Sequence, residues 1–274
     1  MTQPKNNPTE YDQLILDHYK KVARNNGLAS TSTMEDPYIR QSEIDFFLSS
    51  LRAETSRKGR PLRVMDAGCG NGYLLQTIAQ RFPEFTLFGL EFTPELYEQA
   101  LSRKIPSLTL RHGDARLKED FYEDIDVLIT ERMVINILNK DHQLVVLKNI
   151  FKSLSSDGLL LMSESFAEPL AELNEAREEM CLDPIDESYQ NLYLDESLME
   201  HMLSWGMEEE EGTLPSNYLS TQFFVTRILH KSLRPEKGKV KFSRFAKFFT
   251  EALPPAVGNY SPILFRTFRK GNAC

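Results

Sequence analysis

Short apolar runs alternate with longer amphipathic stretches through the first 165 residues of the chain. The runs have the length and composition of buried strands, and the stretches between them carry apolar residues at helical spacing. The runs of strand type are residues 62–66, 86–91, 108–112, 125–130 and 158–164. The helical stretches between them are residues 72–82, 94–103 and 140–154. This alternation is typical of βαβ units, and it predicts an α/β fold with a doubly wound, mostly parallel sheet.

Two helices are predicted ahead of the first strand. Residues 11–24 have apolar positions close to helical spacing, among them Leu14, Ile15 and Val22. A second helix begins at Asp36 and runs to about Leu51, because Asp caps helices well and the following proline is tolerated in the first turn.

The alternation stops after residue 164. Residues 167–205 are acidic and mostly helical in pattern, and strand character returns at 219–229 and 261–269. Two late strands without a crossover between them predict an antiparallel arrangement at the edge of the sheet. Residues 242–249, which lie between these strands, combine phenylalanines at helical spacing with basic residues, so we expect a basic helix there.

Composition narrows the class of protein. With 274 residues and 41% hydrophobic side chains, the chain can bury a sizeable core. No apolar run approaches the roughly 20 residues that span a bilayer, and the polar N-terminus lacks a secretory signal, so a cytoplasmic protein is expected. The odd number of widely spaced cysteines, Cys69, Cys181 and Cys274, predicts neither disulfides nor a zinc site, and no metal is expected.

Charge is distributed unevenly. The net charge of −8 makes nucleic acid an unlikely partner for the whole molecule. However, residues 163–212 hold sixteen acidic residues and one basic residue, whereas 227–270 hold eleven basic and two acidic. These blocks either pair within the molecule or pair across a homodimer. Peripheral contact of the basic helix with an anionic membrane is a further hypothesis, and packing of that helix on the core is the favoured one.

A glycine-rich segment, Asp66-Ala67-Gly68-Cys69-Gly70-Asn71-Gly72, lies directly between the first predicted strand and the next helix. Glycines there permit positive φ and let a ligand approach the backbone. Doubly wound sheets bind their ligands at the carboxyl ends of the strands, which is where this segment lies. The segment therefore predicts a site for a nucleotide-like ligand.

Acidic residues end the next two predicted strands. Glu91 is suited to accept both hydroxyls of a ribose, and Asp114 is suited to accept an exocyclic adenine amine. A dinucleotide fingerprint would require glycine at the sixth position from Gly68, but that residue is Tyr73. The pattern therefore favours an adenosyl ligand other than NAD.

Taken together, these motifs make residues 36–164 resemble the class I, Rossmann-like methyltransferases that use S-adenosylmethionine. The resemblance implies that Asp66 and the glycines hold the methionine part, Glu91 the ribose and Asp114 the adenine. Phe92 and Ala115 would contact the ring, and Arg40 would reach the cofactor carboxylate. The full set of cofactor-binding residues expected is Arg40, Asp66, Ala67, Gly68, Cys69, Gly70, Gly72, Glu91, Phe92, Asp114, Ala115 and Glu131.

The acceptor side is less sharply defined by sequence. The resemblance points the segment after the fourth strand toward the acceptor, which makes Arg132 and Asn136 candidate substrate residues. Asn174 is a further candidate, from the acidic insertion. A hydroxyl acceptor needs a general base, and Glu164 at the end of the fifth strand is the predicted one. The alternatives are that Glu164 only caps the next helix and that Glu131 or His142 acts instead; the latter is expected to be solvated.

Four regions follow from this interpretation. Residues 1–56 form an N-terminal helical cap, 57–165 the cofactor-binding core, 166–216 an acidic helical insertion or lid, and 217–274 the C-terminal strands around a basic helix. The predicted function is methyl transfer from S-adenosylmethionine to an oxygen or nitrogen of a small molecule or glycan unit. The alternatives are a cofactor-binding scaffold or regulatory protein, and a nucleic-acid methyltransferase that uses the basic C-terminal segment.

Overall fold

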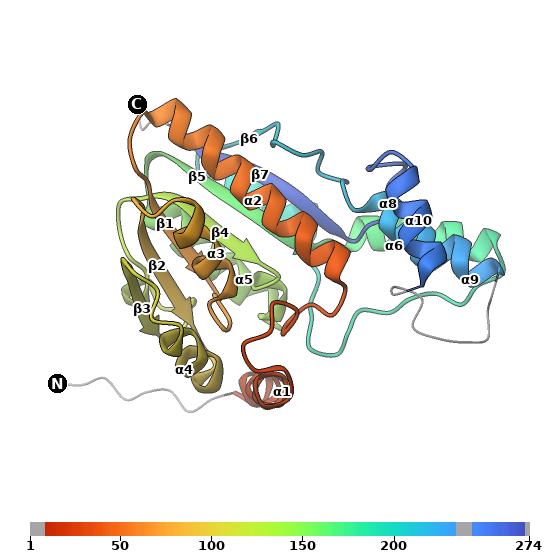
Figure 1. Ribbon diagram of the computed structural model, residues 1–274, viewed down its shortest axis with the longest axis horizontal. Coiled ribbons are helices and arrows are strands. Elements are labelled where there is room, and N and C mark those ends of the chain that lie inside the picture. Colours follow the sequence, from red (N-terminus) through yellow and green to blue (C-terminus); the bar gives the residue numbers. More distant parts are fainter. Residues whose placement is uncertain (1–8, 234–242, 272–274) are drawn as a thin grey trace.

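The computed structural model describes residues 9–233 and 243–271. Cys274 and the first residue of the predicted basic helix, Phe242, lie outside these ranges. Within them, one seven-stranded sheet has the order β3-β2-β1-β4-β5-β7-β6 (Figure 1). The strands are β1 (Arg63–Ala67), β2 (Thr86–Glu91), β3 (Leu108–His112), β4 (Ile125–Glu131), β5 (Leu154–Ser165), β6 (Met207–Glu210) and β7 (Ile263–Lys270).

Strands β1 to β5 pair in parallel, and β7 pairs antiparallel with both β5 and β6. The predicted α/β class, with a mostly parallel sheet and an antiparallel edge, is confirmed. The α-helices are α1 (Glu10–Asn26), α2 (Pro37–Lys58), α3 (Tyr73–Arg81), α4 (Pro94–Ser102), α5 (Lys140–Ser153), α6 (Ala167–Glu179), α7 (Glu196–Ser204), α8 (Ser220–Phe223), α9 (His230–Leu233) and α10 (Arg244–Ala252).

Helices cover both faces of the sheet. On one face, α2 and α3 contribute Phe47 and Leu75 to a core that includes Val64 of β1. On the other face, α5 and α7 contribute Ile150 and Met199 to a second core. Burial of apolar area on both sides makes the sheet the rigid interior of the molecule.

Helix α2 is longer than the sequence indicated. The side chain of Asp36 accepts from the backbone N–H of Tyr38 at 3.0 Å and caps the predicted start. The predicted end at Leu51 is wrong, because the helix continues to Lys58 and stops at Gly59, which is left-handed. Within the extra turns, Glu54 forms an ion pair with Arg57.

The strand predicted at 219–229 is also wrong. This segment is α8 and a π-helical stretch (Phe224–Leu229), and α9 follows it directly. Its apolar residues Leu219, Phe223 and Ile228 reach the core from a helical surface, which a short apolar run does not distinguish from a strand. The strand that pairs antiparallel with β7 on the side away from β5 is instead β6, a four-residue strand in the acidic part of the chain.

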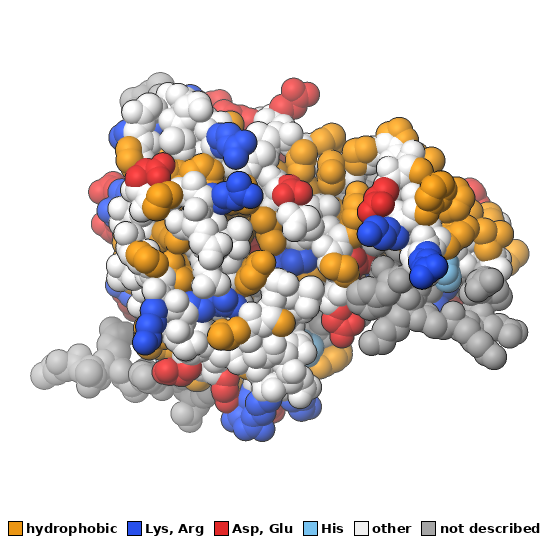
Figure 2. All heavy atoms as spheres, viewed as in Figure 1, with side chains coloured by type: hydrophobic (Ala, Val, Ile, Leu, Met, Phe, Trp, Pro, Cys, Tyr) orange, Lys and Arg blue, Asp and Glu red, His pale blue; other side chains and the backbone are white. Residues whose placement is uncertain are grey.

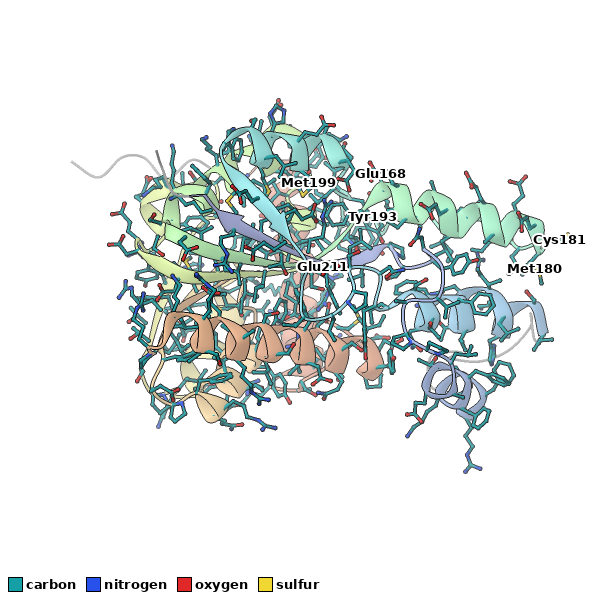
Figure 3. The ribbon with its side chains drawn as sticks, turned by 90° about the horizontal axis from the view of Figure 1, so that it is seen from above. Glu168, Met180, Cys181, Tyr193, Met199 and Glu211 are labelled. Carbon is teal, nitrogen blue, oxygen red and sulfur yellow. The ribbon has the colours of Figure 1, made fainter. Side chains whose placement is uncertain are left out.

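The acidic and basic blocks pair partly within the molecule. On β7, Arg266 forms ion pairs with Glu196 and Glu209. Figure 3 shows β6 running into the loop that carries Glu211, while α6 extends away from the sheet toward Met180 and Cys181. The possibility of a charge-paired homodimer stays a prediction.

A lobe formed by α6, α8, α9 and α10 projects beyond the sheet (Figure 1). Figure 2 shows hydrophobic side chains gathered over this lobe, where Phe248 is 63% exposed. Within the described ranges, no helix combines the length and apolar character that crossing a bilayer requires.

Candidate functional site

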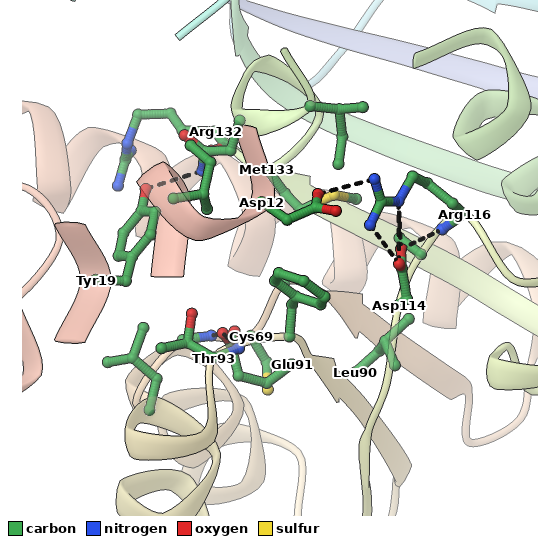
Figure 4. A pocket seen from close by; sticks show the side chains of 18 of the residues that line it. Asp12, Tyr19, Cys69, Leu90, Glu91, Thr93, Asp114, Arg116, Arg132 and Met133 are labelled. Carbon is green, nitrogen blue, oxygen red and sulfur yellow. Dashed lines mark hydrogen bonds and ion pairs between the residues drawn. The ribbon is translucent and has the colours of Figure 1, made fainter. Parts of the chain in front are cut away.

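A pocket of about 360 Å³ lies at the carboxyl ends of β1, β2 and β4. Its size falls in the range of small-molecule sites. One wall is the glycine-rich turn after β1, and the opposite side is closed by α1, whose residues Asp12, Ile15 and Tyr19 line the pocket (Figure 4). The first helix, rather than the acidic insertion, thus closes this pocket. The role of residues 166–216 as a lid stays a prediction.

The glycine-rich turn brings backbone to the pocket wall. Gly68 has φ of 78°, and a Cβ at this position would overlap the side chain of Met133. Gly70 has φ of 55° and turns its N–H toward Glu91. Gly68, Cys69 and Gly70 line the pocket, whereas Gly72 caps α3 and packs against Ala100 of α4.

Glu91 is buried at the end of β2. One carboxylate oxygen accepts from the N–H of Gly70 and the other from the N–H of Thr93, both at 2.8 Å. Burial raises the pKa of Glu91, and the two N–H donors oppose that shift. Each oxygen keeps a second lone pair, so the carboxylate can still accept from ligand hydroxyls.

Asp114 follows β3 and connects the pocket to α1. Its carboxylate pairs with the guanidinium of Arg116 at 2.6 Å, and Arg116 also pairs with Asp12 of α1 at 2.8 Å. Figure 4 shows this chain of three charged groups at one side of the pocket. Phe92 and Ala115 line the same region.

Buried charges stand at the end of β4. Arg40 of α2 forms an ion pair with Glu131, and Arg132 forms ion pairs with Glu131 and with Glu43 of α2. Burial raises the pKa of Glu43 to about 7, whereas Arg40 and Arg132 overcome the effect of burial at Glu131 and lower its pKa to about 2. Arg40, Glu131 and Arg132 all line the pocket, and their ion pairs connect α2 to the end of β4.

Two residues of the predicted cofactor set lie beneath the pocket rather than in its wall. Asp66 and Ala67 are buried in the last part of β1, and neither lines the pocket. Burial raises the pKa of Asp66 well above its usual value. The Oδ1 atom of Asp66 has no hydrogen-bond partner within the described part of the chain.

The structure does not place Glu164 where a general base would act. The side chain is fully buried and does not line the pocket. Its carboxylate accepts from the backbone N–H groups of Met133 at 3.0 Å and Val134 at 3.1 Å. Burial raises its pKa to about 7. Glu164 therefore anchors the 3₁₀ turn Val134–Asn136 that forms part of the pocket wall. Its role as a general base stays a prediction.

Asn174 is also outside the pocket. Its amide exchanges hydrogen bonds with the backbone of Ile185, at 3.0 Å and 2.8 Å, and so closes the turn after α6. The other predicted substrate residues, Arg132 and Asn136, do line the pocket. His142 lines it as well, with an exposed side chain.

Sequence reasoning missed the contribution of α1 to this site. Asp12, Ile15 and Tyr19 are spaced by three and four residues, so one face of α1 points into the pocket. The spacing was visible in the sequence, but the direction of that face depends on how α1 packs. No group of three metal-ligating side chains occurs within the described ranges.

Comparison with known proteins identifies relatives of the core. A family model described as a methyltransferase domain matches residues 58–211. The malonyl-[acyl-carrier protein] O-methyltransferase of Bacillus cereus is 30% identical over 147 residues, which are 51% of this chain and 52% of that protein. The trans-aconitate 2-methyltransferase of Deinococcus radiodurans is 36% identical over 52 residues, 19% of this chain and 20% of that protein. The chain spans about half the length of the first of these curated relatives and a smaller share of the other.

A solved structure shares the whole architecture. The N-methyltransferase NodS of Bradyrhizobium japonicum, in complex with S-adenosyl-L-homocysteine, superposes with a TM-score of 0.54. The match covers 93% of this chain and 98% of that one at 11% identity, which is a likeness of fold.

Proposed function

Because the chain belongs to the family of class I methyltransferases that use S-adenosylmethionine, we propose that it methylates a carboxylate oxygen of a small organic acid or acyl thioester. The named relatives support oxygen as the acceptor atom. Malonyl and aconitate groups both carry free carboxylates, and one relative is an O-methyltransferase by name.

The observation that carries this proposal is the convergence of three strand ends on one pocket. Glu91, Asp114 and Arg40 line it together with the glycine turn. In the proposed arrangement Glu91 accepts from the ribose hydroxyls, Asp114 from the adenine amine, and Arg40 donates to the cofactor carboxylate. The residues fit such a ligand, since the Nε of Arg40 has no hydrogen-bond partner among the described residues.

The proposed reaction requires the protein mainly to position the cofactor and the acceptor. S-adenosylmethionine supplies a methyl group on a positive sulfur, and the acceptor oxygen displaces that sulfur to give a methyl ester and S-adenosylhomocysteine. The pocket must align the two reactants and exclude water. A carboxylate acceptor is already ionised at neutral pH, so no general base is needed. This agrees with the burial of Glu164 behind the wall and with the ion pairs that occupy Glu131.

A hydroxyl acceptor is the second candidate, because His142 lines the pocket with an exposed imidazole that could take a proton. The two acceptors differ in their dependence on that residue. Loss of turnover in His142→Ala at unchanged cofactor affinity would favour the hydroxyl.

The first experiment is titration calorimetry with S-adenosylhomocysteine, with NAD as the control ligand. Next, malonyl thioesters, trans-aconitate, a sugar and a primary amine are incubated with methyl-labelled cofactor. A methyl ester loses its label as methanol in mild alkali, whereas ethers and methylamines keep it. Alkali-stable product would reject the carboxylate proposal, and binding without any transfer would indicate the scaffold alternative.

A nucleic-acid acceptor is not favoured by the charges of β7. Arg266 and Arg269 both form ion pairs with glutamates, so these two guanidinium groups are already engaged. Binding to RNA or DNA that falls steeply with salt would reverse this preference.

A further inference from the structure

The hydrogen bond between Asn136 and Tyr19 leaves the hydroxyl proton of Tyr19 free to be donated to a ligand. Asn136 Nδ2 donates to the hydroxyl oxygen of Tyr19 and to the backbone carbonyl of Arg132, each at 2.8 Å. Both amide hydrogens of Asn136 are therefore used. The hydroxyl of Tyr19 acts as the acceptor in this bond, so its own proton remains to be donated.

Tyr19 and Asn136 come from different parts of the fold. Tyr19 projects from α1, and Asn136 ends the 3₁₀ turn that Glu164 anchors behind β4. Both line the pocket, and Figure 4 shows the hydroxyl of Tyr19 directed toward the Arg132 segment. The donor is thus held between the helix that covers the pocket and the loop that follows β4.

The surroundings keep the phenol protonated. Burial raises the pKa of Tyr19 to about 12, although Asn136 and Arg132 oppose the shift. At neutral pH the group is therefore a hydrogen-bond donor and not a base. Donation from Asn136 to its oxygen also polarises the O–H bond and strengthens the bond that it can make.

The side-chain oxygen of Asn136 lacks a hydrogen-bond partner among the described residues. The Oδ1 atom of Asn136 is buried and accepts no hydrogen bond from any described residue. A buried polar atom left unpaired costs free energy. Because Oδ1 is an acceptor, it can pair with a water molecule or with a hydroxyl of a ligand, and it does not pair with the acceptor carboxylate itself. Apolar side chains border the pair on the same wall, among them Ile15 and Ile137.

We propose that Tyr19 and Asn136 form the acceptor subsite, in which the Tyr19 hydroxyl donates to one oxygen of the acceptor carboxylate while the other oxygen faces the methyl group. This inference rests on the proposed function. Ile15 and Ile137 contact the hydrocarbon part of the acceptor.

The test is Tyr19→Phe, which removes the donor and keeps the ring. The affinity for S-adenosylhomocysteine is expected to change by less than about twofold, whereas kcat/KM for the acid should fall about 10- to 100-fold, the range for a hydrogen bond to a charged group. Tyr97→Phe is the matched control, because Tyr97 lies on α4 outside the pocket lining and its variant should behave as the parent protein.

The results distinguish a failure of the acceptor subsite from a failure of the proposed function. Unchanged kcat/KM in Tyr19→Phe overturns the subsite, and so does a loss of S-adenosylhomocysteine affinity that matches the loss of turnover. A parent protein that binds the cofactor but methylates no acid overturns the proposed acceptor and the subsite together.

A second variant covers the case in which Tyr19→Phe does not fold. Asn136→Ala removes the donor to Tyr19 and should lower kcat/KM for the acid at unchanged cofactor affinity. Where both single variants fold, the double variant should lose little more than Tyr19→Phe alone, because the two side chains act as one unit. Fully additive losses would show that they act separately, and would reject the paired subsite.

Discussion

The carboxylate of Glu91 at the end of β2 accepts a hydrogen bond from the backbone N–H of Gly70, which lies 2.8 Å away in the turn after β1. A second N–H, from Thr93, binds the other oxygen of the same carboxylate. One side chain thereby fixes the positions of two adjacent strand ends. These two bonds hold the geometry of the proposed cofactor site, and such preorganisation lowers the entropy cost of binding.

Replacing Glu91 with alanine should weaken cofactor binding. The variant loses the proposed contact to the ribose and leaves the N–H groups of Gly70 and Thr93 without their acceptor. We expect the Kd for S-adenosylhomocysteine to rise at least about tenfold, which corresponds to about 1.4 kcal/mol. Titration calorimetry measures it, and Glu98→Ala on the exposed side of α4 is the control. An unaltered Kd would remove Glu91 from the cofactor set.

Gly68→Ala tests the tight approach of the turn to Met133. Gly68 and Gly59 both have positive φ, 78° and 64°, but only a Cβ at Gly68 would overlap a neighbouring side chain. Gly59→Ala should cost about 1 kcal/mol of unfolding free energy, since only the backbone is strained. Gly68→Ala should cost at least about 2 kcal/mol and impair cofactor binding. Urea unfolding of both variants compares them, and equal losses would show that Met133 moves aside freely.

Local patterns predicted the part of the site that a single strand–turn–helix unit creates. The glycine turn, Glu91 and Asp114 occur at fixed places in consecutive units, so their convergence follows from the parallel sheet. Asp12 and Tyr19 could not be placed in this way, because their positions depend on how α1 packs across the strand ends. Such contacts join residues far apart in the chain and leave no periodic signal.

The same distinction explains where the structure departs from the sequence analysis. A carboxylate at the end of a strand has the same sequence pattern whether it faces a ligand or backbone, and Glu164 faces the N–H groups of its neighbours. The apolar run at 219–229 is consistent with a strand or with a helix packed on the core, and tertiary contacts select the helix.

Glu164→Gln should flatten the pH dependence of stability. Burial raises the pKa of Glu164 from 4.5 to about 7 in the folded chain. A carboxyl group with a higher pKa in the folded state favours folding when it is protonated, so this contribution is lost as the pH rises from about 5 to 7. The free energy of unfolding should therefore fall over that range, and fall less in the variant. Urea titrations at pH 5, 6 and 7 measure the slopes.

The variant Glu164→Gln also tests whether Glu164 acts as a general base. Since Glu164 does not reach the pocket, Glu164→Gln should retain most of its turnover with the acid acceptor at pH 7. A folded variant that binds cofactor normally but has lost turnover by about 100-fold or more would restore Glu164 as a general base.

Asp12→Ala should speed cofactor release. Asp12 connects α1 to Arg116 and thus to Asp114, and the bridge is mostly buried. Loss of an ion pair worth up to about 1 kcal/mol should raise the dissociation rate of S-adenosylhomocysteine by roughly two- to fivefold. Stopped-flow displacement measures the rate. Asp17→Ala, on the exposed side of the same helix, should leave it unchanged. Equal rates in both variants would show that α1 does not limit release.

Arg269→Ala should destabilise the sheet edge. Its guanidinium binds Glu210 of β6 and Glu54 of α2, at 2.6 Å and 3.2 Å. Because Glu54 is buried, we expect a loss of about 2 kcal/mol in the free energy of unfolding. Lys247→Ala removes an exposed pair with Glu251 and should change stability by less than about 0.5 kcal/mol. A similar small effect for Arg269→Ala would show that the edge pairs contribute little.

Strand β6 is an edge strand of the sheet, so its length and sequence affect whether two copies of the chain can associate there. An outermost strand with free N–H and C=O groups invites another molecule to extend the sheet, and such joining is a route to aggregates. Here that strand is only four residues long, Met207–Glu210, and three of the four are glutamates. Glu209 and Glu210 already pair with Arg266 and Arg269 of β7, so the short length of this strand, rather than its net charge, leaves little edge for another molecule to extend.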